Sequence, residues 1–454
     1  MRVERGRISG ARGRARASRP TCGPLTPPSS IPITVAKPTP ITASTIAGVN
    51  STPILDRRRS LPPESVPSGL NEHGSQTYGL LVGIFLIAIG VVAGDRVLDS
   101  IRQWFSSTLP GWPLGIRLAA IMVAAVAGCL AAVAVHELGH VLAGLSVGFR
   151  FVSVRVGRLQ VTRPFRWSWS RSVTRGAAGM AHLLPVGTDR LGARAFGFLV
   201  GGPAANWAAA GIIMALPFDT GLFRDAFVFW SVVVGTVNLV PFGAGTFVSD
   251  GRRLVMLVRH PAEAHRWLAM LAMISELDEG IPPESLSPDF IAAAIAIRDD
   301  SFDTVAAHLL AYSTRFYQHD DAGAAEALEV CLARAEHFPE AIRETLMCEA
   351  AIFQGRRRMR VDLAEAWLED IPTATVNPGL RQLAEAAVLE ARGDRTGARQ
   401  MLEAVEVLHQ RRPDMPGRNA GLRSLRRWKV DLEQAQQAPL VRDCLLYTSP
   451  SPRD

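Results

Sequence analysis

Cysteine is scarce in this chain, and paired cysteines are missing. The 454 residues include five cysteines, with neither the spacing of a zinc-binding knuckle nor the density of a disulfide framework. A small secreted protein held together by disulfides is therefore excluded, and reducing cytosolic surroundings are expected. Charge is missing too, over a stretch long enough to cross a bilayer: no Asp, Glu, Lys or Arg occurs from Leu118 to Val135.

The amino-terminal segment 1–76 lacks the apolar run of a secretory signal. It is rich in Pro, Ser, Thr and Arg, with seven Arg among its first nineteen residues against one Glu. Such a composition does not supply enough apolar surface to form a core. We expect a disordered basic tail, with non-native sequence upstream of the true start as the alternative.

Four apolar segments within residues 77–258 predict a polytopic membrane helix bundle. They cover 78–94, 118–147, 195–216 and 226–240. A soluble protein can bury one such helix, but four in so short a region are typical of a membrane protein. The chain is thus expected to be mainly α, with the lipid bilayer as one of its partners.

The distribution of arginine predicts which way these spans face. The connection 149–194 contains nine Arg and a single acidic residue, Asp189. The positive-inside rule places that connection in the cytoplasm. Counting spans outward then puts both termini in the cytoplasm of a multi-pass protein, which we expect to lie in a bacterial plasma membrane.

The motif His136-Glu137-Leu138-Gly139-His140 interrupts the second apolar segment. On a helix the two histidines lie one turn apart on one face, the spacing with which two imidazoles bind one zinc ion. Glu137 stands beside them, placed to accept a proton from the attacking water rather than to bind the metal. Ionisable groups are costly at membrane depth, so a functional site is the leading interpretation. The alternative is a packed helix whose polar groups are satisfied by neighbours.

The arginine-rich connection also has strand character. Residues 151–156 and 159–162 alternate apolar with polar side chains around Gly157-Arg158, a pattern that predicts a small cytosolic β-hairpin. A strand edge beside a metal site can hold a peptide in extended form by strand addition. A hairpin that merely lies at the surface is the alternative.

Three sequence elements together resemble the site-2 protease family of intramembrane zinc metalloproteases. They are the HELGH motif on the second span, Gly202-Pro203-Ala204-Ala205-Asn206 on the third, and Asn238-x-x-Pro241 followed by Asp250-Gly251 after the fourth. The resemblance covers about residues 115–258 and keeps the order of all three elements. It implies a zinc-dependent endopeptidase within the membrane.

The resemblance also implies roles for individual residues. His136 and His140 would bind zinc, Glu137 would be the general base, and Asp250 would be the third ligand. A carboxylate ligand suits the site because it partly neutralises a dication where water is scarce. The alternative for Asp250 is a cap for a helix that starts near Arg252.

Asn206 and Asn238 would support the site or hold the substrate backbone, by the same resemblance. For Asn206 the alternative is a hydrogen bond that joins two membrane helices. The chain departs from the family pattern at one point. Twelve positions separate Asn238 from Asp250, more than in the compact form of the element, and this distance puts Asp250 in question.

Residues 259–443 change to helical spacing of apolar residues, which predicts a soluble α-helical domain. Turn signals at 319–321, 354–356 and 392–394 recur at intervals close to the tetratricopeptide period. The stretch 391–402 is similar to part of such a repeat. A tetratricopeptide-like array offers a groove for a cytosolic protein partner, and the alternative is a plain helical domain with no partner.

Residues 444–454 look like a translated sequencing adapter. We expect this stretch to carry no biology and leave it out of the fold, as one would a cloning scar. A natural disordered tail is the alternative.

The function expected from these features is hydrolysis of peptide bonds in membrane-spanning or membrane-proximal substrates, with Zn2+ as cofactor and no nucleic-acid partner. The helical domain would recruit or regulate substrates. An inactive membrane scaffold that presents the helical repeats to partners is the main alternative, but pseudoenzymes rarely keep a complete His-Glu-x-x-His. A metallopeptidase that is anchored by its helices and acts on soluble substrates is a third possibility.

Overall fold

The computed structural model describes residues 53–56, 99, 102–103, 111–169, 178–217, 221–244, 247–372, 378–411 and 421–434. These residues are mainly helical and include a small antiparallel sheet, as the sequence predicts. The predicted first span, 78–94, lies outside the described residues, as do the stretch 444–454 and nearly all of the predicted tail.

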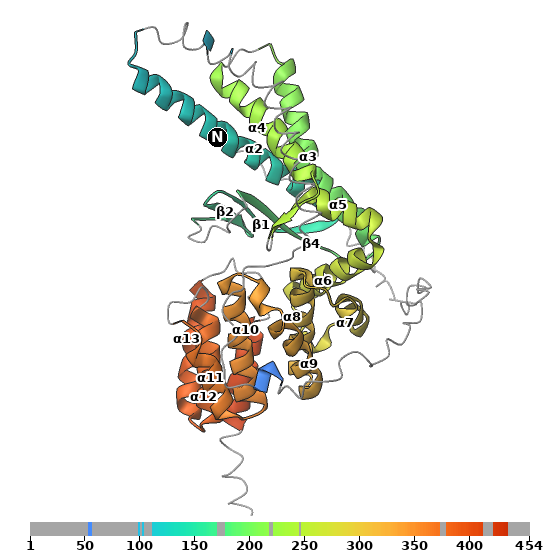
Figure 1. Ribbon diagram of the computed structural model, residues 1–454, viewed down its shortest axis with the longest axis vertical. Coiled ribbons are helices and arrows are strands. Elements are labelled where there is room, and N and C mark those ends of the chain that lie inside the picture. Colours follow the sequence, from blue (N-terminus) through green and yellow to red (C-terminus); the bar gives the residue numbers. More distant parts are fainter. Residues whose placement is uncertain are drawn as a thin grey trace, which may run out of the picture. The chain divides into compact units, whose positions relative to one another are not determined.

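Three helices are long and apolar enough to cross a membrane, namely α2 (Leu114–Ser146), α3 (Leu191–Ala215) and α4 (Leu222–Leu239). They lie side by side in Figure 1. Glycines let α2 and α3 approach closely: a Cβ added to Gly139 would lie 2.4 Å from the Gly201 carbonyl oxygen. A Cβ on Gly201 would lie 2.3 Å from the Ala143 Cβ. Small residues at this crossing are typical of helix pairs in membranes.

The predicted hairpin is confirmed, but it belongs to a four-stranded sheet of order β3-β2-β1-β4. Its turn is Gly157-Arg158, and Gly157 has φ 57°, a conformation that favours glycine. His182 lies in β4, where it pairs with Ser153 of β1. Among the described residues, β4 pairs only with β1, so no strand lies along its outer edge. The strands are β1 (Phe149–Val156), β2 (Leu159–Thr162), β3 (Arg166–Trp169) and β4 (Gly179–Pro185).

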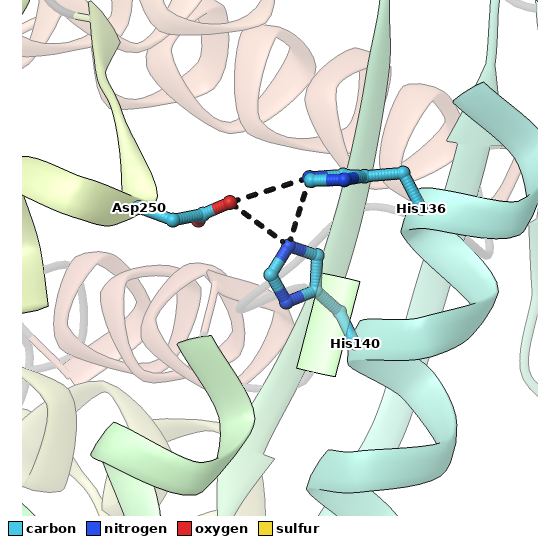
Figure 2. A group of neighbouring side chains, drawn as sticks. All are labelled: His136, His140 and Asp250. Atoms are coloured by element: carbon cyan, nitrogen blue, oxygen red, sulfur yellow. Dashed lines mark hydrogen bonds and ion pairs between the residues drawn. The ribbon is translucent and has the colours of Figure 1, made fainter. Parts of the chain in front are cut away.

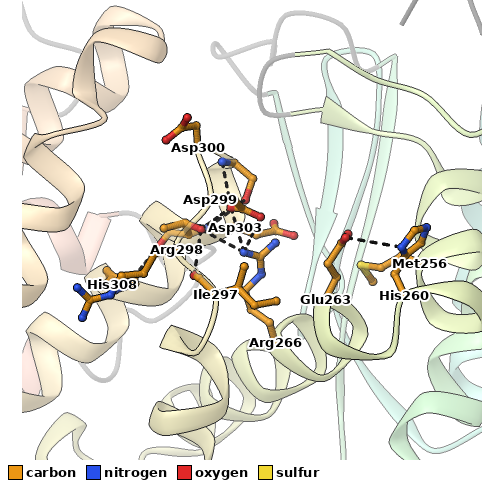
Figure 3. Close-up of polar contacts among 12 residues, drawn as sticks. Met256, His260, Glu263, Arg266, Ile297, Arg298, Asp299, Asp300, Asp303 and His308 are labelled. Carbon is orange, nitrogen blue, oxygen red and sulfur yellow. Dashed lines mark hydrogen bonds and ion pairs between the residues drawn. The ribbon is translucent and has the colours of Figure 1, made fainter. Parts of the chain in front are cut away.

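Helices α5 (Asp250–Arg259) and α6 (Pro261–Glu279) lead from the apolar helices into the helical domain. Arg253 of α5 makes a bidentate ion pair with Asp303, at 2.7 and 3.0 Å. The buried Arg266 of α6 donates to both oxygens of Asp299 at 3.1 Å (Figure 3). Burial raises the pKa of Asp299, but hydrogen bonds from Ser301, Thr304 and Arg266 outweigh it and hold that pKa well below its usual range. Paired charges of this kind join α5 and α6 to the helices that follow.

The helical domain contains three helix pairs joined by short turns: α8 with α9, α10 with α11, and α12 with α13. Short connections make the members of each pair antiparallel neighbours. A further helical stretch covers 421–434. The elements are α7 (Pro288–Ile295), α8 (Phe302–Tyr317), α9 (Asp321–Leu332), α10 (Glu340–Ile352), α11 (Val361–Glu369), α12 (Pro378–Ala391) and α13 (Arg395–Arg411), with short 3-10 turns η2 (Pro283–Ser285) and η3 (Ala335–His337) and a π-helical segment η4 (Phe353–Arg357).

Two of the three predicted turns have the same chemistry. The Asp320 carboxylate accepts from the Gly323 N–H at 2.9 Å, and the Asp394 carboxylate accepts from the Gly397 N–H at 2.8 Å. Aspartate at this position caps a helix, so the pattern Asp-x-x-Gly starts α9 and α13, the second helices of two of the three pairs. The turn predicted at 354–356 is wrong. These residues prolong α10 as the π-helical segment, because Gly355 lies against the Ala387 carbonyl rather than in a turn.

Glu349 of α10 is half-buried and makes the stability of the helical domain depend on pH. Burial raises its pKa to about 7, from an ordinary value of about 4.3. The folded state therefore binds the proton more tightly than the unfolded state, so Glu349 lowers stability as pH rises from about 4.3 to about 7. Glu349→Gln, which stays neutral, should stabilise the domain by about 3 to 4 kcal/mol at pH 8 and by almost nothing at pH 4.

Thermal unfolding of the full chain in detergent, followed by circular dichroism across that pH range, measures this difference. Glu340→Gln is the matched control, because Glu340 is exposed at the start of the same helix. A difference between Glu349→Gln and wild type that does not grow with pH would contradict the assignment.

Candidate metal centre

Three side chains converge where α2 meets the start of α5 (Figure 2). The Nε2 atoms of His136 and His140 are 3.2 Å apart. Each of them lies 3.2 Å from the same oxygen, Oδ2 of Asp250. The two histidines are 4% and 5% exposed, so bulk water does not supply their partners. Residues that are 110 positions apart in the chain thus share one small, buried site.

The second nitrogen of His140 decides which atom faces Asp250. Its Nδ1 lies 2.8 Å from the Phe198 carbonyl oxygen, which can only accept a hydrogen bond. Nδ1 therefore carries the proton, and in a neutral imidazole Nε2 then presents a lone pair. That lone pair points at a carboxylate oxygen and a second imidazole nitrogen. Either a proton on one imidazole or a metal ion can lie between electron pairs that converge in this way, and histidine ligands of metals are oriented by such backbone carbonyls.

The spacing of the three atoms fits a zinc ion. Zinc binds histidine nitrogen and carboxylate oxygen at about 2.0–2.2 Å, which sets tetrahedral ligand atoms about 3.3 Å apart. The three separations of 3.2 Å match that value. Two histidines and one carboxylate leave a fourth position, which is the arrangement of catalytic rather than structural zinc. His136, His140 and Asp250 could therefore hold a metal ion with ligand spacing that suits zinc, and they leave one coordination position open.

A short hairpin absorbs the long spacing between Asn238 and Asp250. Strands β5 (Gly243–Ala244) and β6 (Phe247–Val248) pair with each other. The buried Ser249 closes the base of this hairpin: its Oγ donates to the Val240 carbonyl at 2.7 Å and accepts from the Phe242 N–H at 3.0 Å. The pairing brings Val248 back beside Gly243, so the chain returns to the end of α4 just before Asp250.

The helix cap at this point is Ser249, not Asp250. Ser249 Oγ accepts from the Arg252 N–H at 3.2 Å and Asp250 is the first residue of α5. The interpretation of Asp250 as a cap is wrong, because the residue before it fills that role. Its carboxylate is thereby left to face the two histidines.

Two glycines hold the ligands by allowing close approach. A Cβ added to Gly251 would lie 1.9 Å from the Leu239 carbonyl oxygen, so the start of α5 touches the backbone at the end of α4. A Cβ added to Gly202 would lie 2.3 Å from His140 Nε2 itself. The backbone of α3 therefore packs directly against this imidazole, and only glycine fits at position 202.

Glu137 lies on the same helix as the histidines but faces β4. Its side chain is 7% exposed, and the Ala181 N–H donates to its carboxylate. A Cβ on Gly179 would lie 2.3 Å from Glu137 Oε1, so glycine is needed at the start of this strand. Glu137 is thus buried between the metal-ligand helix and an edge strand, and it is not among the three converging ligand atoms.

Asn206 and Asn238, the two other predicted residues, have different surroundings. The Asn206 amide is fully buried and donates to the carbonyls of Ala132 and Ser231, both at 3.2 Å. It joins α2, α3 and α4 one turn before His136, which is the interhelical hydrogen bond considered from the sequence. The Asn238 amide donates to the Val234 carbonyl of its own helix at 2.9 Å. Asn206 thus positions the ligand helix, whereas the hydrogen bond of Asn238 is to α4 itself.

Sequence reasoning missed three contributors to the site: Ser249, Gly179 and the Phe198 carbonyl. Ser249 carried a signal, because serine before an amphipathic helix is a common cap. A backbone carbonyl carries no such signal.

Comparisons with protein-family models, with curated proteins and with solved structures find no match to this chain.

Proposed function

We propose that the chain is an intramembrane zinc endopeptidase of the site-2 protease type. The observation that carries the proposal is the convergence of His136, His140 and Asp250 on helices of which α2 is long and apolar enough to cross a membrane. Glu137 lies buried on the same helix, one residue from a ligand. A metal centre with a fourth position and a neighbouring carboxylate supports hydrolysis rather than a purely structural role.

The residues divide the chemistry among them. His136, His140 and Asp250 would hold the zinc ion, which when bound polarises a carbonyl and makes water acidic enough to attack at neutral pH. Glu137 would accept the proton of the attacking water and pass it to the leaving amine. The Phe198 carbonyl fixes the orientation of His140, and Gly202 fixes its position.

The outer edge of β4 supports a way to present the substrate. A helical substrate must unwind before cleavage, since its amides are hydrogen-bonded and shielded. An extended peptide can add to an edge strand through main-chain hydrogen bonds, and on β4 the Ala181 N–H already donates to Glu137. Because Gly179 of β4 lies against Glu137, a peptide bound there would run close to the site. Membrane-spanning or membrane-proximal proteins are the proposed substrate class.

The proposed setting is a multi-pass protein of a bacterial plasma membrane with both termini in the cytoplasm. Three described helices meet the length and apolarity needed to span. The nine arginines of 149–194 support a cytoplasmic sheet. Some of them also have structural partners: Arg150 pairs with Asp278 at 3.1 Å, and Arg194 donates to the Val147 carbonyl at 2.7 Å.

Glu137→Gln tests the proposal. The variant keeps all three ligands, so zinc measured by atomic absorption in the detergent-purified protein should stay near one ion per chain. Cleavage of single-span reporter substrates should fall by about 100- to 10,000-fold, the usual contribution of a general base. Wild-type protein that binds zinc poorly and cleaves nothing, yet binds partners normally, would favour the inactive scaffold. Full activity in Glu137→Gln would exclude Glu137 as the base.

A further inference from the structure

A short piece of the amino-terminal segment is bound to the helical domain. Residues Ile54–Asp56 form a 3-10 turn, η1, and the Leu55 side chain is 2% exposed within the core of that domain. This stretch lies inside the segment for which the sequence predicts disorder, and it departs from that prediction because Leu55 has a buried site. Figure 1 shows η1 beside α9 and the helices that follow it.

Side chains of the helical domain bind every polar group of the Leu55 main chain. The Glu329 carboxylate accepts from the N–H groups of Ile54 and Leu55, at 2.6 and 3.0 Å. The Leu55 carbonyl oxygen accepts from Gln354 Nε2 at 2.8 Å and from Trp367 Nε1 at 3.1 Å. Strands and helices usually satisfy main-chain groups with other main-chain groups, whereas here side chains of other elements bind the main chain of the segment.

The acidic residue of the segment has its own partners. Asp56 Oδ1 accepts from Gln354 Nε2 at 3.1 Å and forms an ion pair with Arg358. The backbone closes on itself here, since the Asp56 N–H donates to the Pro53 carbonyl at 3.0 Å. The contacts therefore involve an aliphatic residue (Ile54), Leu55 and Asp56 in a turn conformation.

The groups that bind the segment lie on well-packed helical elements. Gln354 belongs to the π-helical segment η4, and the neighbouring Gly355 lies against the Ala387 carbonyl of α12. Single π turns inside α-helices are frequent at functional sites. With the segment in place, Trp367 is 1% exposed and Gln354 is fully buried. Glu329, Gln354 and Trp367 come from three different helical elements, α9, η4 and α11, so the site depends on the array and not on one helix.

We propose that this surface is a peptide-recognition site for the sequence aliphatic–Leu–Asp, and that the chain's own segment Pro53–Asp56 occupies it as an intramolecular ligand. Four residues held by one leucine and a few side-chain hydrogen bonds form a small interface, so exchange is expected. Tethering raises the local concentration of the segment and keeps it bound against weak competitors. A partner with the same motif would displace it. The proposal stands independently of the metal centre.

A labelled peptide with the sequence of residues 51–58 tests the site by fluorescence anisotropy. Full-length wild type and Leu55→Asp are compared in detergent, both checked for helicity by circular dichroism. Leu55→Asp releases the tethered competitor, so it should bind the peptide about tenfold or more tightly than wild type does. The same peptide with Asp in place of Leu should not bind. Peptide binding by Glu137→Gln should equal that of wild type, which separates this result from proteolysis.

The residues of the site are tested in the Leu55→Asp background. Adding Glu329→Ala should weaken peptide binding about tenfold or more, because two main-chain donors lose their acceptor. Glu326→Ala is the matched control: it lies on the same helix α9 and pairs with Arg298 instead. If both variants bind alike, or if the Leu-to-Asp peptide binds as well as the original, the recognition site is refuted.

Trypsin cleavage after residues 57–59 covers the case in which Leu55→Asp does not fold. The single variant Glu329→Ala should be cut there about tenfold faster than wild type, and Glu326→Ala should not. Equal cleavage would show a fixed structural element and overturn the proposal. A wild-type dimer that Leu55→Asp converts to a monomer would show exchange between two copies and overturn its intramolecular part.

Discussion

Replacing Asp250 by Asn is expected to abolish metal binding at the candidate centre while leaving the fold intact. The change removes a negative charge that lies 3.2 Å from both histidine nitrogens, and an amide is a poor zinc ligand. Loss of an outer partner of a zinc site costs roughly 10- to 100-fold in affinity, and loss of a direct ligand should cost more. Zinc content after dialysis, and competition with a chromogenic chelator, measure the change.

Asparagine makes this substitution decisive because it caps helices about as well as aspartate. If Asp250 served only the start of α5, Asp250→Asn would keep both stability and any metal. Asp225→Asn, in the first turn of α4, is the control for loss of an acidic residue at a helix start. Wild-type zinc affinity in Asp250→Asn would show that Asp250 is not a ligand. Because two histidines alone are too few for a stable zinc centre, that result would contradict the proposed site.

The helix that carries His136 and His140 was predictable because its pattern is local. The spacing of His136 and His140 depends only on the helical repeat, and the apolar residues around them indicate a helix. Asp250 was predictable only through the order of elements along the chain. The spacing from Asn238 argued against it, because nothing in the sequence shows that residues 243–248 fold back as a closed hairpin.

Strands β3 and β4 could not be predicted in the same way. Arg166–Trp169 alternates, but over only four residues, and Gly179–Pro185 reads as a short apolar run. Such runs are ambiguous between helix and strand until a partner is known. The partner of β4 is β1, which lies more than twenty residues earlier in the chain.

Leu55 shows the same limit in the amino-terminal segment. Its neighbours include prolines and three arginines, a composition that predicts disorder. The residue is buried because Glu329, Gln354 and Trp367, all more than 270 positions away, build its site. Composition describes what a segment does alone and carries no information about a distant binding surface.

The second large effect is expected from Gly202→Ala, a change that removes no ligand. The added Cβ would lie 2.3 Å from His140 Nε2 and 2.7 Å from its Cδ2, well inside van der Waals contact. The imidazole has no room to move, because its Nδ1 is held by the Phe198 carbonyl on one side and its Nε2 faces Asp250 on the other. The variant should therefore lose most of its zinc and with it the cleavage of single-span substrates.

Gly211→Ala isolates this steric effect from a general effect on helix α3. Gly211 lies on the same helix with nothing within 4 Å of an added Cβ. Alanine favours a helix over glycine by about 1 kcal/mol, so Gly211→Ala should melt at the same temperature as wild type or higher and keep its zinc. Gly202→Ala gains the same preference for helix. If it nevertheless loses metal, the loss comes from contact with His140. Wild-type zinc content in Gly202→Ala would mean that the ring and α3 can separate, and that the close approach does not hold the ligand in place.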